Sequence, residues 1–166
     1  MQKIGFLIGR FQPFHLGHEL IVREMIASGC RPCLLLGCPY GKNEKNPYSF
    51  RERVSHINSV FDFEKVGLMA IHDYPCDKLW SDEVMHEIHI FTEKEETPEL
   101  WYYPKPQDKT PDGKHYIEEL FNGRIKLIKA TWPEKLGIVI NATDIRADIH
   151  GNRHFLHPNV AKMICG

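Results

Sequence analysis

Two histidines near the start of the chain have the spacing and the setting of a phosphate site. They are His15 and His18 in the segment Gly9–His18, which reads Gly-Arg-Phe-Gln-Pro-Phe-His-Leu-Gly-His. A helical pattern over Leu16–Ala27 places both at a helix N-terminus, where unsatisfied N–H groups and the positive end of the helix dipole favour an anion. Imidazoles can donate hydrogen bonds there, and Gly17 has no side chain to keep a phosphate from the backbone. The segment therefore predicts a binding site for a phosphorylated ligand.

Other motifs that could carry phosphate or metal chemistry are incomplete. The segment Gly37–Asn43 has three residues between its glycines, where a P-loop has four, and Asn43 replaces the magnesium-binding serine or threonine. Cys30 and Cys33 form a C-x-x-C pair, but no second pair follows, and five cysteines without framework spacing favour reduced thiols. We therefore expect no metal held by protein ligands.

Strand-like apolar runs and helical patterns alternate along the whole chain, which favours an α/β fold with a Rossmann-like, doubly wound parallel sheet. In such a sheet the ligand site lies beyond the carboxyl ends of the strands, where the segment Gly9–His18 follows the first apolar run. The expected strands are Ile4–Ile8, Pro32–Gly37, Val66–Ile71, Glu99–Tyr103 and Ile125–Ile128. The expected helices are Leu16–Ala27, one opened by Ser49, Ser81–Glu93, Tyr116–Phe121, Asn141–Ile149 and Pro158–Ile164.

Length and charge restrict the partners. With 166 residues the chain is expected to form one domain, residues 1–166, with a proline- and lysine-rich surface loop or lid at residues 104–114. Lysine and arginine total 21 against 22 aspartates and glutamates, so a net charge of -1 gives no positive field for nucleic acid or an anionic membrane. No run approaches the roughly 18 to 20 apolar residues of a membrane span. We expect a cytoplasmic protein with a small-molecule ligand, and a homo-oligomer stays compatible with the sequence.

Three segments together resemble a known family. The motif His15-x-Gly17-His18 is similar to the H-x-G-H motif of nucleotidylyltransferases, and its surrounding loop is similar to that of nicotinamide mononucleotide (NMN) adenylyltransferases. Asn46–Arg53 resembles the Asn-Pro-aromatic…Glu-Arg segment of that family, and Asn141–Arg146 resembles its second nucleotide motif, with Asn141 in place of the usual serine. Gly113–Phe121 looks nearest to the branch fused to Nudix hydrolases, and we expect the hydrolase part to be absent from this chain.

The resemblance implies transfer of AMP from ATP to NMN, giving NAD and pyrophosphate. The attacking phosphate monoester is already mostly ionised at neutral pH, because its second pKa is about 6, so catalysis needs positioning and charge stabilisation more than a general base. Mg²⁺ would then travel with the ATP phosphates. The expected catalytic residues are His15, His18, Arg10 and Arg146. The expected ATP-binding residues are Gly9, Arg10, Phe11, His15, Gly17, His18, Lys42, Asn141, Thr143 and Arg146.

Three residues are candidates for the NMN site. Arg53 could grip the phosphate with two parallel hydrogen bonds, although a solvated arginine on a helix face is the alternative. The family resemblance implies an aromatic residue stacked on the nicotinamide, and Trp80 could supply it through a cation-π contact or could equally be part of the core. Asp73, at the end of a predicted strand, could hydrogen-bond a ribose or an amide.

Two other functions remain open at this point. Another H-x-G-H enzyme would act on phosphopantetheine or would use CTP as a cytidylyltransferase; the wording of Gly9–His18 and the Asn46–Arg53 segment favour NMN. A catalytically silent module that senses pyridine nucleotides is the alternative outside enzymes, and intact His15, His18 and Arg146 argue against it. Use of nicotinate mononucleotide depends on one amide-reading contact, which the sequence does not identify.

Overall fold

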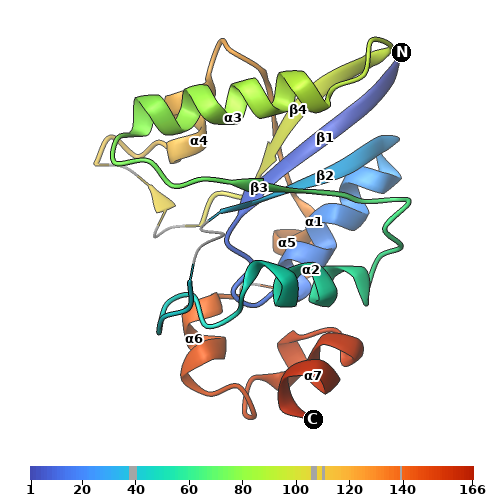
Figure 1. Ribbon diagram of the computed structural model, residues 1–166, viewed down its shortest axis with the longest axis vertical. Coiled ribbons are helices and arrows are strands. Elements are labelled where there is room, and N and C mark those ends of the chain that lie inside the picture. Colours follow the sequence, from blue (N-terminus) through green and yellow to red (C-terminus); the bar gives the residue numbers. More distant parts are fainter. Residues whose placement is uncertain (38–40, 106–107, 110, 139) are drawn as a thin grey trace.

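The strands form one parallel sheet in the order β3-β2-β1-β4-β5 (Figure 1). The computed structural model describes residues 1–37, 41–105, 108–109, 111–138 and 140–166. The strands are β1 (Gln2–Gly9), β2 (Cys30–Gly37), β3 (Gly67–Ile71), β4 (Glu96–Tyr102) and β5 (Lys126–Lys129). β1 lies at the centre, and its Leu7 pairs with Leu34 of β2 on one side and with Trp101 of β4 on the other.

Helices cover both faces of this sheet, which confirms the predicted doubly wound fold (Figure 1). One face packs against the first two helices through Ile21, Val22 and Ile57, and the other packs against the next two through Val84 and Ile117. The helices are α1 (Leu16–Ala27), α2 (Phe50–Asn58), α3 (Asp77–Phe91), α4 (Tyr116–Phe121), α5 (Trp132–Lys135), α6 (Ala142–Ala147) and α7 (Pro158–Cys165), with a 3-10 turn at Arg153–Phe155.

The strand order creates a crevice at one edge of the sheet. From β1 the chain moves outward to β2 and β3, and then returns to place β4 on the opposite side of β1. Helices that follow neighbouring strands therefore diverge to opposite faces at β1 and β4, and ligands bind at the carboxyl ends of strands at such a point. A third apolar cluster, which includes Ile140, Ile145 and Val160, holds α6 and α7 together and packs against Leu16 at the start of α1.

A close contact fixes α1 on the sheet. A Cβ atom at Gly5 of β1 would lie 2.7 Å from Met25 Cε and 3.0 Å from Trp101 Nε1, so a larger residue there would force the end of the Met25 side chain of α1 to shift. Because α1 begins directly after the loop of the two histidines, this packing also fixes where that loop lies.

Three helices begin with a histidine as the N-cap residue. His15, His115 and His157 each accept hydrogen bonds at Nδ1 from backbone N–H groups in the first turns of α1, α4 and α7. Serine, threonine, aspartate and asparagine are the usual residues at this position. Histidine offers the same acceptor geometry and leaves Nε2 for a second contact.

Most predicted elements are confirmed, with shifted boundaries. α3 begins at Asp77 instead of Ser81 and β4 at Glu96 instead of Glu99, while the short α5 has no counterpart among the predictions. Cys30 and Cys33 are free thiols packed in the apolar clusters of opposite faces of the sheet. No helix in the described ranges has the length and hydropathy to cross a bilayer.

Candidate active site

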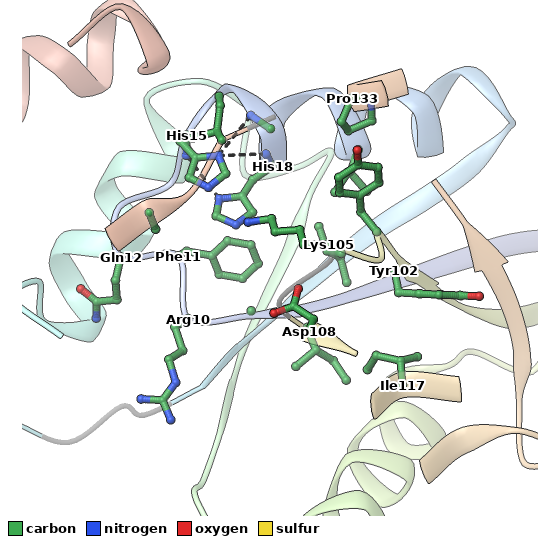
Figure 2. Close-up of a pocket in the computed structure, with 18 of the residues that line it drawn as sticks. Arg10, Phe11, Gln12, His15, His18, Tyr102, Lys105, Asp108, Ile117 and Pro133 are labelled. Carbon is green, nitrogen blue, oxygen red and sulfur yellow. Dashed lines mark hydrogen bonds between the residues drawn. The ribbon is translucent and has the colours of Figure 1, made fainter. Parts of the chain in front are cut away.

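A cavity of about 540 Å³ opens at the carboxyl ends of β1 and β4 (Figure 2). Its walls come from the β1–α1 loop, the start of α1, the β4–α4 connection and α6. The cavity thus brings together both ends of the chain, as the predicted motifs require. Predicted site residues that line it are Gly9, Arg10, Phe11, His15, Gly17, His18, Thr143 and Arg146.

His15 and His18 cap α1 reciprocally. His15 Nδ1 accepts from the N–H groups of Gly17 (3.1 Å) and His18 (3.4 Å), and His18 Nδ1 accepts from the His15 N–H (3.3 Å). The two rings stack with centroids 3.7 Å apart and planes 16° apart. The Gly17 and His18 N–H groups, which were expected to face a phosphate, donate to His15 in this structure, so direct binding of a phosphate by the backbone of this turn stays a prediction.

The lack of a side chain at Gly17 also makes room for the capping ring of His15. A Cβ atom there would lie 2.9 Å from Cε1 and 3.0 Å from Nδ1 of His15, so a side chain would displace the capping imidazole. Gly17 therefore leaves room for the ring of His15 to fold over the helix start.

The capping contacts determine which nitrogen of each imidazole carries the proton. Burial lowers the pKa of His15 to about 3 and lowers that of His18 well below its usual range, with the positive charge of Lys105 adding to both shifts. Both rings are therefore neutral at pH 7. Since each Nδ1 accepts a hydrogen bond, the proton of each neutral ring lies on Nε2. His15 Nε2 is buried without a hydrogen-bond partner among the described residues, so a donor is left for a ligand.

Aromatic rings hold His18 in this orientation. The Phe11 ring meets it edge-on at 4.8 Å and the Phe14 ring lies along it at 5.7 Å between centroids. Phe11 reaches this place through a backbone φ of 51°, which is uncommon for a residue with a side chain. Such local strain is typical of residues whose placement a site requires.

Arg146 joins the two sequence motifs. From α6 its guanidinium donates to the Gln12 carbonyl (2.7 Å) and to Thr143 Oγ1 (3.3 Å). Gln12 in turn exchanges two hydrogen bonds of 2.9 Å with the backbone of Tyr48. Asn141 does not line the cavity; it caps α6 by accepting from the Thr143 N–H (3.0 Å), a function that asparagine and serine share.

Arg10 lies at the junction with a second cavity. Its exposed side chain turns away from the histidine pair (Figure 2). It donates to Asn46 Oδ1 (3.2 Å), which links the β1–α1 loop to the Asn-Pro segment. The second cavity, of about 520 Å³, shares Ile8, Gly9, Arg10 and Tyr116 with the first. It also contains the predicted Asp73 and Trp80.

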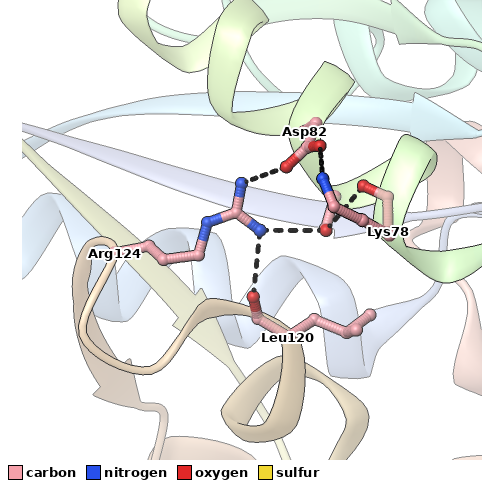
Figure 3. Close-up of polar contacts among 5 residues, drawn as sticks. Lys78, Asp82, Leu120 and Arg124 are labelled. Carbon is pink, nitrogen blue, oxygen red and sulfur yellow. Dashed lines mark hydrogen bonds and ion pairs between the residues drawn. The ribbon is translucent and has the colours of Figure 1, made fainter.

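Trp80 is held between α3 and α4. The centroid of its ring lies 6.2 Å from that of Tyr116 and 5.9 Å from that of Phe121. The side chain is half-buried: it packs against the apolar cluster of this face and also lines the second cavity. Arg124 clamps the two helices together, as it donates to Asp82 (2.6 Å), to Ser81 Oγ (2.9 Å) and to the Leu120 carbonyl (3.2 Å) (Figure 3).

Two predicted binding residues lie elsewhere. Arg53 is fully buried and lines neither cavity; its Nη1 donates to the carbonyls of Arg10 (2.7 Å) and Gly37 (2.8 Å). It is therefore not the solvated arginine that was the alternative from the sequence, and its role as a grip for the NMN phosphate stays a prediction. Lys42 also lines neither cavity and pairs with Glu52 Oε2 at 2.7 Å, a contact that lowers the pKa of that carboxyl to about 2.

Comparison with known families agrees with this geometry. Residues 6–148 match the model of the cytidylyltransferase-like family, a range that contains the histidine pair, Trp80 and Arg146. The chain belongs to the cytidylyltransferase-like family.

Known proteins that are similar in sequence include nicotinamide-nucleotide adenylyltransferases. The nicotinamide-nucleotide adenylyltransferase of Thermoplasma acidophilum is 33% identical over 87 residues, which cover 50% of this chain and 49% of that protein. The chain thus spans about half the length of this relative. A bifunctional NMN adenylyltransferase/ADP ribose pyrophosphatase from Francisella tularensis superposes with a TM-score of 0.78 at 22% identity, covering 100% of this chain and 51% of that one. The structure of that enzyme with AMP and a manganese ion superposes with a TM-score of 0.75 at 22% identity, and the match covers 100% of this chain and 50% of that one. These likenesses show the shared fold.

The sequence did not predict two charged residues in the first cavity of this cytidylyltransferase-like protein. Lys105 and Asp108 line it from the β4–α4 connection, which was expected to be only a surface loop or lid at residues 104–114. Residues 106, 107 and 110 of that loop lie outside the described residues. The available signal was a lysine two residues after an aromatic strand end, at the carboxyl edge where ligands bind.

The buried neutral state of His15 predicts a loss of stability in acid. Its pKa is about 3 when folded and 6.5 in an ordinary environment, so between these values the unfolded chain binds a proton that the folded chain does not. Stability therefore rises with pH and is lost as pH falls below about 6.5, by about 1.4 kcal/mol for this residue between pH 7.5 and pH 5.5. Urea unfolding at the two pH values measures the change.

The control is His15→Asn, which keeps a capping acceptor and does not titrate. We expect the stability of this variant to fall less between pH 7.5 and pH 5.5 than that of the natural protein, by about 1 kcal/mol. Equal losses in the two proteins would mean that His15 is not held neutral by burial.

Proposed function

We propose that this chain transfers the AMP group of ATP to nicotinamide mononucleotide, giving NAD and pyrophosphate. The observation that carries the proposal is the His15–His18 pair, whose Nε2 donors lie at a cavity that meets a second, aromatic-lined cavity at Gly9 and Arg10. The names of the sequence relatives support the same reaction. In this proposal residues 1–166 form one nucleotidylyltransferase domain, and residues 104–114 are a surface loop beside the first cavity.

The reaction joins two phosphates and needs little proton chemistry. A phosphate oxygen of NMN attacks the α-phosphorus of ATP, and the bond from that phosphorus to the β-phosphate oxygen breaks, so the electron pair leaves with pyrophosphate. The NMN phosphate is mostly ionised at neutral pH, because its second pKa is about 6. Negative charge grows on the α-phosphoryl oxygens and on the leaving group, and neutral Nε2–H donors can stabilise it without giving up a proton.

The two cavities suit the two substrates. We assign the triphosphate of ATP to the first cavity, where His15, His18 and Arg146 supply hydrogen-bond donors. We assign NMN to the second, where Trp80 can stack on the positively charged pyridinium ring and Asp73 can accept from a ribose or amide. The α-phosphorus would then lie at the shared residues Gly9 and Arg10, between nucleophile and leaving group.

Mg²⁺ fits this reaction as a companion of ATP. The described residues contain no cluster of three or more histidine, cysteine, aspartate or glutamate side chains that could hold an ion, and Asp108 is the one carboxylate among the described lining residues of the first cavity. Such a donor set suits a cation that keeps most of its water and is bound through substrate phosphates. Bound in that way, Mg²⁺ would neutralise charge on the phosphates.

A substrate panel tests the proposal. ATP, CTP and GTP are crossed with NMN, nicotinate mononucleotide and phosphopantetheine in the presence of Mg²⁺, and pyrophosphate and dinucleotide are measured. We expect ATP with NMN to give equal amounts of NAD and pyrophosphate. If pyrophosphate is released only when phosphopantetheine is the acceptor, or only when CTP is the nucleotide, the chain belongs to another branch of the family. Absence of product with every pair, in a protein that still binds ATP, would indicate a silent sensing module.

A further inference from the structure

One cation of the first cavity has no part in the contacts described so far. Lys105 lies three residues beyond the end of β4 and lines the same cavity as His15 and His18 (Figure 2). In the close-up its side chain crosses the cavity, with the amine beside the ring of His18 and Asp108 near its base. Its positive charge adds to the burial that lowers the pKa of both histidines.

The ammonium is poor in acceptors. Among the described residues Lys105 forms no side-chain hydrogen bond or ion pair within 4.0 Å, although its surroundings are buried enough to lower its own pKa. The cavity that it lines also contains His15, His18 and Arg146, whose imidazole Nε2–H and guanidinium N–H groups are hydrogen-bond donors. Asp108 is the nearby carboxylate and partly offsets the charge. A cluster of donors around a partly desolvated cation fits an anion.

The loop holds Lys105 in this position from both ends. Before it, the Tyr102 hydroxyl donates to Glu118 (2.6 Å) and the Tyr102 carbonyl accepts from the Ala130 N–H (2.8 Å). After it, the Asp108 N–H donates to the Lys105 carbonyl (3.0 Å), and the Asp108 carboxylate lies 3.8 Å from Nε2 of His115. His115 is itself fixed as the buried N-cap of α4.

We propose that Lys105 is a further catalytic residue, which binds the triphosphate beside the histidine pair and stabilises the negative charge on the departing pyrophosphate. The proposal rests on the proposed adenylyl transfer at this site. Lys105 keeps its protons throughout; it donates hydrogen bonds to the phosphate oxygens as the bond between the α-phosphorus and the bridging oxygen breaks. The loop at residues 104–114 would thus supply a charge that neither sequence motif contains.

The test compares Lys105→Met with Lys105→Arg. Methionine keeps an unbranched side chain without charge, and arginine restores the charge. We expect Lys105→Met to lower kcat by roughly tenfold to 10²-fold, in the range of a lost donor to a developing anion, and Lys105→Arg to recover part of the loss. Lys114→Met, an exposed lysine of the same loop, is the matched control and should behave like the natural protein.

Binding of inorganic tripolyphosphate, measured by calorimetry without NMN, separates this proposal from the proposed function. We expect Lys105→Met to bind it at least fivefold more weakly than Lys114→Met. If the natural protein binds tripolyphosphate but makes no NAD, the adenylyl transfer is wrong, and the affinity difference alone decides whether Lys105 meets phosphate. Unchanged affinity or unchanged turnover in folded Lys105→Met overturns the catalytic role. Lys105→Gln replaces it if the methionine variant does not fold.

Discussion

Replacing His15 by asparagine is expected to lower turnover by roughly 10²-fold while the protein keeps its fold. The two ring nitrogens of His15 have different hydrogen-bonding roles. Nδ1 accepts from the Gly17 N–H, and Nε2 is a buried donor without a partner among the described residues. Asparagine is a good N-cap and can replace the first contact, but it has no group at the position of Nε2. Loss of one donor to a developing negative charge costs about 3 to 4 kcal/mol. Single-turnover measurement of pyrophosphate release checks the result.

The matched control is His157→Asn, the same exchange at another histidine N-cap. His157 Nδ1 accepts from the Asn159 N–H (3.1 Å) at the start of α7, and the residue lines neither cavity. We expect normal turnover in this variant. If His15→Asn is folded and keeps turnover within a fewfold of normal, the Nε2 donor does not act in the reaction, and the site assignment of this motif must be withdrawn.

Arg146 acts on the same charge from the other motif. If it stabilises the same transition state, combining His15→Asn with Arg146→Ala should lose less than the product of the two single losses. A loss equal to that product would indicate that the two residues act in separate steps.

The sequence predicts the fold well where burial is continuous. β1 and β2 are buried on both faces, so their apolar runs stand out, and α1 has the matching helical pattern and boundaries. The first turn of α3 was missed because Asp77 and Lys78 are exposed there and Cys76 makes no side-chain cap. α5 was missed because four residues are too short for a periodic pattern.

The sequence predicts those residues of the candidate site that belong to a contiguous motif. The histidine pair and Arg146 line the cavity, as their motifs suggested. Lys105 belongs to a loop without periodicity, and its place just after an aromatic strand end was the one signal that tied it to the cavity. For Arg53 the sequence held a signal that was missed. Arg53 and Ile57 have the i, i+4 spacing of one face of α2, and both are fully buried.

Replacing Arg53 by methionine is expected to destabilise the protein by about 3 kcal/mol, because two buried carbonyls lose a charged donor. The carbonyls belong to Arg10 and Gly37, at the ends of β1 and β2, with N···O distances of 2.7 and 2.8 Å. For a chain of this length such a loss lowers the melting temperature by about 6 to 12 °C. Thermal unfolding measures the shift, and Arg51→Met, an exposed arginine of the same helix, should change it little.

Kinetics of the same variant distinguish the positioning role from a phosphate grip. Arg53 fixes the backbone of Arg10, and Arg10 lines both cavities, so displacement of this loop should raise the KM values for ATP and NMN together. A residue that held only the NMN phosphate would raise the KM for NMN alone and leave stability near that of Arg51→Met. That second pattern would restore the contact first expected from the sequence, and it would require the buried guanidinium to leave both carbonyls when NMN binds.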